Sequence, residues 1–195
     1  MVLIDFGAGN LHSVYKALKF IGADVEITKD INKIENSEAV IFPGVGAFGS
    51  VMISIRKNNL ENVIKKAVTS KKPFLGICVG MQVLFEEGEE NPEEKGLGIL
   101  KGKVVRFKKA RKIPHIGWND VEGRVPGHRL QGKFYFVHSY YVLPEDKNIV
   151  YGETEYDGEK FTSIIKKDNL FAVQFHPEKS GDAGLELLRS FVRSQ

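Results

Sequence analysis

The amino-acid sequence predicts an α/β protein with a mixed, largely parallel central sheet and helices on both faces. Short apolar runs alternate with amphipathic stretches in the first half of the chain, whereas closely spaced strand patterns and turn signals fill most of the second half. The chain has 195 residues, 42% of them hydrophobic, which suffices for a substantial core. We therefore expect one domain over residues 1–195.

The first half predicts successive βα units. Residues 2–6 are an apolar run interrupted only by Asp5, and a turn at 7–10 leads into an amphipathic helix that ends at Gly22. The expected strands are at 2–6, 25–28 and 39–42, and the expected helices at 11–21, 48–56 and 60–68. In such a parallel sheet, Gly7, Gly44 and Cys78 lie at one edge, where the carboxyl ends of the strands meet.

The turn at Gly7 and Gly9 follows a strand, as in dinucleotide-binding proteins. That fingerprint needs a third glycine three residues later, and His12 occupies the position. We therefore expect no nucleotide cofactor.

The second half predicts short strands and hairpins. We expect strands at 102–108, 121–123, 134–142, 149–154, 161–166 and 171–175, with hairpin turns at 157–158 and 167–169. An amphipathic helix with Leu185, Leu188, Phe191 and Val192 on its apolar side is expected at 184–192.

A candidate nucleophile stands at the end of the apolar run 73–77. Cys78 is bracketed by Gly76 and Gly80, which is the spacing of a nucleophile elbow, where a sharp strand-to-helix turn holds the reactive side chain clear of the sheet. At the start of the following helix, the Val79 amide would point toward the sulfur, favour thiolate and offer an oxyanion donor. A lone cysteine is more often a buried apolar residue, so the elbow needs a partner base.

His176 and Glu178 provide that base and its orienting group. They follow a predicted strand, and Pro177 stiffens the chain between them. A carboxylate two residues on can fold back to hold one imidazole nitrogen. A cysteine on an elbow with a distant histidine and carboxylate is the arrangement expected for nucleophilic catalysis.

Two further features belong with this site. The turn Pro43-Gly44-Val45-Gly46 has two glycines in three residues, and its exposed amides could hold a developing anion or form an ordinary turn. Gln82 lies four residues after Cys78, on nearly the same helical face, where its amide could contact a polar substrate group.

Composition excludes several other classes of protein. The net charge is +3, and the basic residues clustered at 101–112 lack the interleaved aromatic residues of nucleic-acid binding. The sequence has no run of ~18 consecutive apolar residues, so it predicts no membrane span. The single cysteine excludes an internal disulfide. His115 and His138 have no companions at metal-ligand spacing, so we expect structural histidines and no metal. We expect a cytoplasmic protein.

These motifs resemble those of the class I (triad) glutamine amidotransferases. The resemblance rests on residues 76–82, 176–178 and 43–46 and spans the chain. Together with residues 114–119, 136–140 and 179–180, the motifs are most similar to the glutaminase subunits of imidazole glycerol phosphate synthases. Met81 stands where the related subunits for anthranilate or carbamoyl phosphate usually have histidine, which points away from those two pathways.

The resemblance implies a flavodoxin-like fold, glutamine hydrolysis and a set of site residues. It makes Cys78 the nucleophile, His176 the acid and base, and Glu178 its orienting group. It places the oxyanion hole at Val45, Gly46 and Val79, and glutamine binding at Gly44, Gln82, Glu90, Ser139 and Tyr140.

The resemblance also implies a partner. Ammonia would pass to a synthase (cyclase) subunit of (βα)8 barrel fold, in a heterodimer that makes imidazole glycerol phosphate and aminoimidazole carboxamide ribonucleotide in histidine biosynthesis. We expect the partner to dock at Asn10, Trp118, Tyr135 and Lys179. Three other functions remain open: an amidotransferase subunit of another pathway, a γ-glutamyl thiol hydrolase, and a scaffold protein that lost catalysis.

Overall fold

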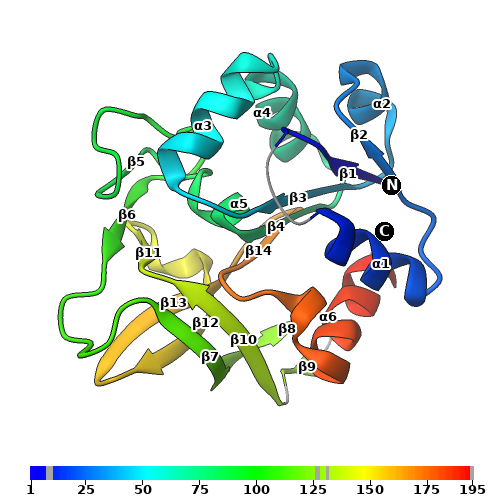
Figure 1. Ribbon diagram of the computed structural model, residues 1–195. Helices are drawn as coiled ribbons and strands as arrows, with labels where there is room; N and C mark the ends of the chain where they lie inside the picture. The colour runs from blue at the N-terminus through cyan, green and yellow to red at the C-terminus, as the bar shows by residue number, and fades with distance from the viewer. Residues whose placement is uncertain (8–10, 126–127, 131, 194–195) are drawn as a thin grey trace.

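Five parallel strands form the centre of the structure (Figure 1), a computed structural model that describes residues 1–7, 11–125, 128–130 and 132–193. In spatial order they are β2 (Glu26–Thr28), β1 (Val2–Ile4), β3 (Val40–Gly44), β4 (Phe74–Cys78) and β14 (Leu170–Val173). Gly44 pairs with Cys78 in the register of β3 and β4. The predicted meeting of strand ends at one edge is therefore confirmed for these two residues.

Helices cover both faces of this parallel region, as predicted (Figure 1). Right-handed crossovers place the helix between β1 and β2 on one face and the helices that follow β2 and β3 on the other. On the first face are α1 (Leu11–Phe20) and α6 (Gly181–Arg193), and on the second are α2 (Ile31–Asn36), α3 (Phe48–Lys57) and α4 (Glu61–Thr69). Asp30 caps α2 by accepting hydrogen bonds from the amides of Asn32 and Lys33 at 2.8 and 3.2 Å.

Antiparallel strands extend the sheet beyond β14. The order continues through β13 (Glu159–Lys167), β11 (Tyr140–Pro144), β6 (Gly102–Arg106) and β5 (Glu87–Gly88), and β12 (Val150–Tyr156), β8 (Glu122–Val125) and β9 (His128–Arg129) branch from β13. Asp157 and Gly158 turn the β12–β13 hairpin with φ of 51° and 80°, and Asp168 turns the next with φ of 50°. Both predicted hairpin turns are confirmed.

A separate two-stranded antiparallel sheet, called the β7–β10 hairpin below, pairs β7 (His115–Asp120) with β10 (Lys133–His138), and β8 and β9 lie between them in the chain. The prediction of one strand over 134–142 is wrong, because the chain breaks at Ser139 and passes from this hairpin into β11 of the main sheet. Ser139 and Tyr140 consequently lie at a junction between two sheets. Two short 3-10 helices, η1 (Lys147–Ile149) and η2 (Pro177–Lys179), complete the described elements together with α5 (Val79–Gln82).

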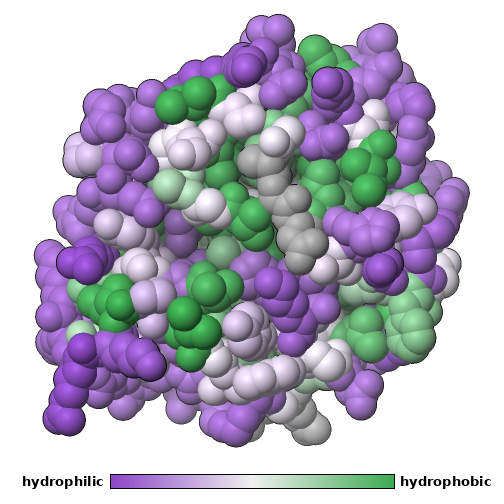
Figure 2. Space-filling view, viewed as in Figure 1, coloured by the Kyte–Doolittle hydropathy of each residue, from purple (hydrophilic) through white to green (hydrophobic). Residues whose placement is uncertain are grey.

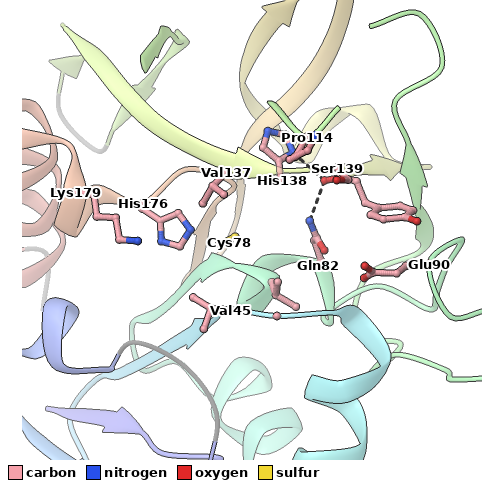
Figure 3. Close-up of a pocket in the computed structure, with 13 residues that line it drawn as sticks. Val45, Cys78, Gln82, Glu90, Pro114, Val137, His138, Ser139, His176 and Lys179 are labelled. Carbon is pink, nitrogen blue, oxygen red and sulfur yellow. Dashed lines mark hydrogen bonds between the residues drawn. The ribbon is translucent and has the colours of Figure 1, made fainter. Parts of the chain in front are cut away.

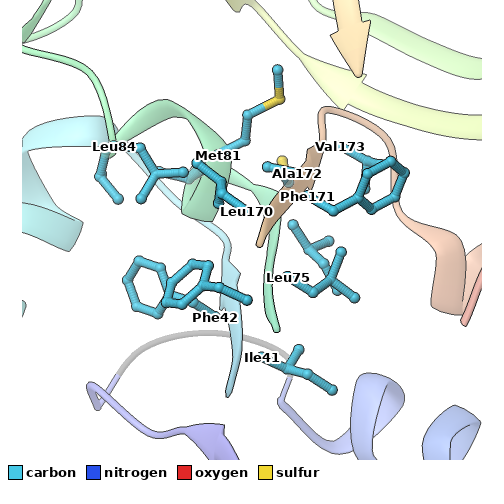
Figure 4. Close-up of a cluster of buried hydrophobic side chains, with 14 of the residues drawn as sticks. Ile41, Phe42, Leu75, Met81, Leu84, Leu170, Phe171, Ala172 and Val173 are labelled. Carbon is cyan, nitrogen blue, oxygen red and sulfur yellow. The ribbon is translucent and has the colours of Figure 1, made fainter. Parts of the chain in front are cut away.

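The core supports the strand that carries the cysteine. Every residue of β3, β4 and β14 is buried, and Figure 4 shows their apolar side chains packed together. Phe42 makes an edge contact with Phe6 at 5.5 Å between ring centroids. Interiors of this kind are close-packed and hard to deform. Cys78 therefore stands on a rigid base.

In the described part of the chain, none of the helices has both the length and the apolar character needed to cross a lipid bilayer.

Candidate active site

Cys78 lies on a strained turn that its neighbours can accommodate. Its φ is 55° and its ψ −116°, a conformation that residues with side chains seldom adopt. A Cβ atom on Gly80 would lie 2.1 Å from the carbonyl oxygen of Phe42, and one on Gly44 would lie 2.4 Å from the Gly80 amide nitrogen. The backbones of β3 and α5 are thus in direct contact, which holds the elbow in place.

The helix after Cys78 is a single short turn. The described α5 has 4 residues, Val79–Gln82, and its last residues continue into turns. A single turn sums few peptide dipoles, so the helix dipole is weak at the position of Cys78. The individual amide of Val79 remains beside the sulfur at the edge of the cavity.

His176 and Glu178 form a buried pair. Nδ1 of His176 is 2.8 Å from Oε1 of Glu178, and each side chain is 2% exposed. The backbone of His176 is also tied to the hairpin, because its amide donates to the carbonyl of Tyr135 at 2.9 Å. Nε2 of His176 has no hydrogen-bond partner among the described residues, which leaves this nitrogen for a proton transfer.

Charge interactions keep this imidazole protonated. Burial alone lowers the pKa of His176, but attraction to Cys78 and Glu178 outweighs burial and raises the pKa to about 10. The histidine is therefore suited to face a thiolate and to donate a proton to a leaving group.

A cavity of about 480 Å³ brings most of the predicted residues together (Figure 3). Its wall contains the nucleophile, the base and the polar residues predicted to hold an amino acid. The lining residues are Val45, Gly46, Cys78, Val79, Gln82, Glu90, Pro114, Val137, His138, Ser139, Tyr140, His176 and Lys179. Gly44 does not line the cavity; it is buried behind it, against Val79 and Gly80.

The turn 43–46 borders the cavity. Val45 and Gly46 both line it, and their amides donate to no other group in the described part of the chain. Gly46 has a φ of 105°, which favours glycine. This turn and Val79 therefore border the cavity together with Cys78.

Gln82 and Glu90 line the cavity while also holding the protein together. Nε2 of Gln82 donates to the Tyr140 carbonyl and to Oε1 of Gln174, each at 3.0 Å, so its oxygen is the atom left for a ligand. Oε2 of Glu90 accepts a hydrogen bond from the Phe48 amide at 2.8 Å and thereby caps α3. This contact holds the segment that carries Glu90 against the start of α3.

Gln174 is a polar residue of the site that the sequence patterns did not reveal. It is fully buried, and its Nε2 donates to Sγ of Cys78 at 3.7 Å. It stands two residues before His176, in the segment between β14 and η2, and His176 lines the cavity beside Cys78. That spacing was the signal that could have identified it.

His115 and His138 form a neutral buried pair. Nδ1 of His115 is 3.1 Å from Nε2 of His138, and Nδ1 of His138 is 2.9 Å from the Tyr140 carbonyl. Because Nδ1 of His138 must donate to the carbonyl, its Nε2 accepts from His115. No metal-binding group of histidine, cysteine or carboxylate residues occurs in the described ranges. Both histidines are satisfied inside the fold, as predicted.

This pair is expected to make the protein sensitive to acid. Burial lowers the pKa of His115 from 6.5 to about 4 and that of His138 to about 3. The unfolded chain therefore takes up protons below about pH 6.5 that the folded chain does not, and stability falls as the pH drops toward 4. Each histidine contributes a slope of up to about 1.4 kcal/mol per pH unit.

Urea unfolding between pH 7 and pH 4 measures this slope. His115→Phe keeps the stacking with Phe136 and Tyr156 and should lower the slope by up to about 1.4 kcal/mol per pH unit, the contribution of one histidine. The substitution also lowers the free energy of unfolding at pH 7, because it removes a buried hydrogen bond. His12→Gln, at an exposed histidine, is the matched control and should leave the slope unchanged. Parallel curves for wild type and His115→Phe would contradict the prediction.

Three of the four predicted interface residues lie together beside the cavity. Trp118 and Tyr135 face each other across β7 and β10, with ring centroids 6.0 Å apart, and Nζ of Lys179 is 5.9 Å from the Tyr135 ring. Ile116, Trp118 and Val137 of the same hairpin are exposed, and Figure 2 shows apolar residues gathered over this region. Asn10, the fourth, lies outside the described residues.

Comparison with known proteins identifies the family. The sequence model described as glutamine amidotransferase class-I matches residues 2–194. The chain belongs to the class-I glutamine amidotransferase family. The predicted family and its fold are thereby confirmed. Two residues of the predicted triad, Cys78 and His176, line the cavity of this amidotransferase.

Relatives of this amidotransferase match it over nearly its full length. Proteins of Caldanaerobacter subterraneus and Aquifex aeolicus, both named imidazole glycerol phosphate synthase subunit HisH, are 48% identical to it. The alignments cover 97% and 98% of this chain and 95% of each relative. Among solved structures, PurLQS from Thermotoga maritima is similar in fold, with a TM-score of 0.78 at 20% identity, covering 99% of this chain and 97% of that one.

Proposed function

We propose that this chain is the glutaminase subunit of an imidazole glycerol phosphate synthase. The observation that carries the chemistry is that Cys78 and His176 line one cavity and Glu178 contacts His176, although the nucleophile is remote in sequence from the other two. The 48% identity to relatives named as HisH subunits supports the pathway.

The side chains and amides around the cavity catalyse glutamine hydrolysis in two steps. Sγ of Cys78 attacks the side-chain amide carbon of glutamine, and the amides of Val45, Gly46 and Val79 stabilise the oxyanion. The imidazolium of His176 gives its Nε2 proton to the leaving nitrogen, which departs as ammonia and leaves a γ-glutamyl thioester. His176 then takes a proton from water, which attacks the thioester and releases glutamate and the thiolate.

The remaining lining residues bind the amino-acid end of glutamine. The carboxylate of Glu90 and the side-chain oxygen of Gln82 face the cavity and are suited to the α-ammonium group. Ser139 and Tyr140, at the junction between the two sheets, offer donors for the α-carboxylate. Gly44 contributes by allowing the turn 43–46 to lie against α5.

The partner is a synthase (cyclase) subunit of (βα)8 barrel fold, with which the chain forms a heterodimer. Ammonia released into water at neutral pH is protonated and lost as a nucleophile, so the partner must cover the cavity. The exposed apolar residues of the β7–β10 hairpin, together with Lys179 at the cavity rim, form a docking surface that is apolar in its centre and carries a positive charge at the rim.

Transfer of labelled nitrogen tests the proposed function. The chain is mixed with candidate synthase subunits, each with its own acceptor substrate, and glutamine labelled with ¹⁵N in the side-chain amide. Label should enter the imidazole product only with the synthase subunit of imidazole glycerol phosphate synthase. Labelling with a subunit of another pathway would assign the chain there, and release of ammonia with none would favour a γ-glutamyl hydrolase.

Charge reversal at the cavity rim is expected to weaken docking. Lys179 is exposed and lies over Tyr135, so Lys179→Glu should place a negative charge against an acidic group of the partner and lower affinity by about tenfold. Titration calorimetry at low salt measures the effect. Lys147→Glu, the same change at an exposed lysine of η1, is the control, and equal affinity for both variants would remove Lys179 from the interface.

A further inference from the structure

The side chain of Gln174 is buried beside the nucleophile. It is 0% exposed, and the short segment that joins β14 to η2 carries both Gln174 and His176. Phe175, between them, packs against Phe134 at 4.3 Å between ring centroids. Two polar side chains from one short segment therefore approach Cys78 together.

Each end of this amide has one partner. Nε2 donates to Sγ of Cys78 at 3.7 Å, and Oε1 accepts from Nε2 of Gln82 at 3.0 Å. A buried amide is costly unless its polar atoms are paired. The sulfur is the acceptor that satisfies Nε2 in the described part of the chain, so the pairing is part of the fold.

The orientation of this amide is fixed by a second group. Nε2 of Gln82 also donates to the Tyr140 carbonyl, at 3.0 Å, and that carbonyl accepts from Nδ1 of His138 at 2.9 Å. With a donor from Gln82 facing it, Gln174 must present its oxygen to Gln82 and its N–H to the sulfur. The cavity wall therefore determines which end of Gln174 faces Cys78.

We propose that Gln174 is a positioning residue for the nucleophile, whose N–H, oriented by Gln82, holds Sγ of Cys78 and stabilises its thiolate before glutamine binds. The inference rests on the proposed role of Cys78. The bond is strongest while sulfur carries charge and weakens once sulfur becomes part of a thioester. Since Gln174 holds the sulfur, Nε2 of His176 is left for the departing ammonia.

Alkylation of Cys78 by iodoacetamide, followed by mass spectrometry as a function of pH, tests this role. The chain has one cysteine, so a single mass addition reports on it. Gln174→Met keeps the size of the side chain and removes the donor. It should shift the pH midpoint of alkylation upward by about one unit and slow alkylation at pH 7 about tenfold.

Gln174→Glu is the second variant. It keeps an oxygen for Gln82 but replaces the N–H by an acceptor, and its midpoint should also shift upward. Thr154→Val is the matched control, because it removes a buried hydrogen bond of 3.0 Å to Ser163 in the same sheet without touching the cavity. Near-ultraviolet circular dichroism identifies the variants that are folded.

A shifted profile in the Gln174 variants, with an unchanged profile in Thr154→Val, supports the proposal. Profiles that superimpose on wild type in a folded Gln174 variant would overturn it, as would an equal shift in Thr154→Val. Absence of alkylation in the wild-type chain is a different failure, since it removes Cys78 as nucleophile and overturns the proposed function as well.

Discussion

Cys78→Ala is expected to abolish glutamine hydrolysis and leave the fold intact. Removing the sulfur removes the atom that forms the thioester, whereas the elbow is held by backbone contacts at Gly44 and Gly80 that the substitution does not touch. The loss should exceed about 10³-fold, as for other nucleophile deletions. Glutaminase activity of the variant, measured with its synthase partner and acceptor present, checks this result.

The same variant should still support the partner's reaction when ammonia is supplied directly. Its affinity for the partner should also be unchanged, because Cys78 is buried beneath the proposed docking surface. Substantial hydrolysis by Cys78→Ala would remove this residue from its role. Failure of added ammonia to support synthesis would show that the substitution disturbs the complex.

The isolated chain is expected to be a poor glutaminase that partner and acceptor ligand activate through kcat. Glycines on both sides of Val45 let one peptide of the turn 43–46 rotate between presenting its N–H and presenting its carbonyl to the oxyanion. A missing oxyanion donor costs about 10²- to 10³-fold in rate and leaves glutamine binding largely intact. Steady-state kinetics of the chain alone, with partner, and with partner and ligand measure the effect.

A paired glycine substitution tests the role of the turn. Gly46 and Gly158 both have positive φ and open space where the methyl group of an alanine would lie, so alanine strains both backbones alike. Only Gly46→Ala should lower the activated kcat, since Gly158 lies in the β12–β13 hairpin turn. Full glutaminase activity of the chain alone, or activation confined to KM, would contradict the predicted activation through the turn 43–46.

The parallel region was predictable because its strands are apolar on both faces. The runs at 39–42 and 73–78 need no knowledge of their neighbours to be recognised as buried strands. β7 was not predicted because its alternation is inverted. His115 faces inward, in an aromatic cluster, while Ile116 and Trp118 face outward, where the docking surface requires them. Hydropathy alone would place these residues on the opposite sides.

The site was predictable where chemistry imposes a spacing. Cys78 between glycines and His176 before Glu178 stand out in the sequence, and the cavity joins them. Gln174 stands out less, because it lies in an apolar strand pattern and its contacts come from Cys78 and Gln82, 96 and 92 residues away. The break at Ser139 depends on pairing with two different sheets, which no local pattern encodes.

The backbone contacts around the elbow limit how this enzyme can be redesigned. A methyl group on Gly44 or Gly80 would overlap backbone atoms that cannot move aside, so libraries that randomise these positions should yield mostly unfolded chains. Substitution of the reactive side chain at position 78 leaves these backbone contacts unchanged. New substrate range must instead come from the rim, where Pro114 and Val137 are exposed and border the cavity without bracing Cys78. The backbone contacts around the elbow and the residues at the cavity rim can therefore be engineered independently.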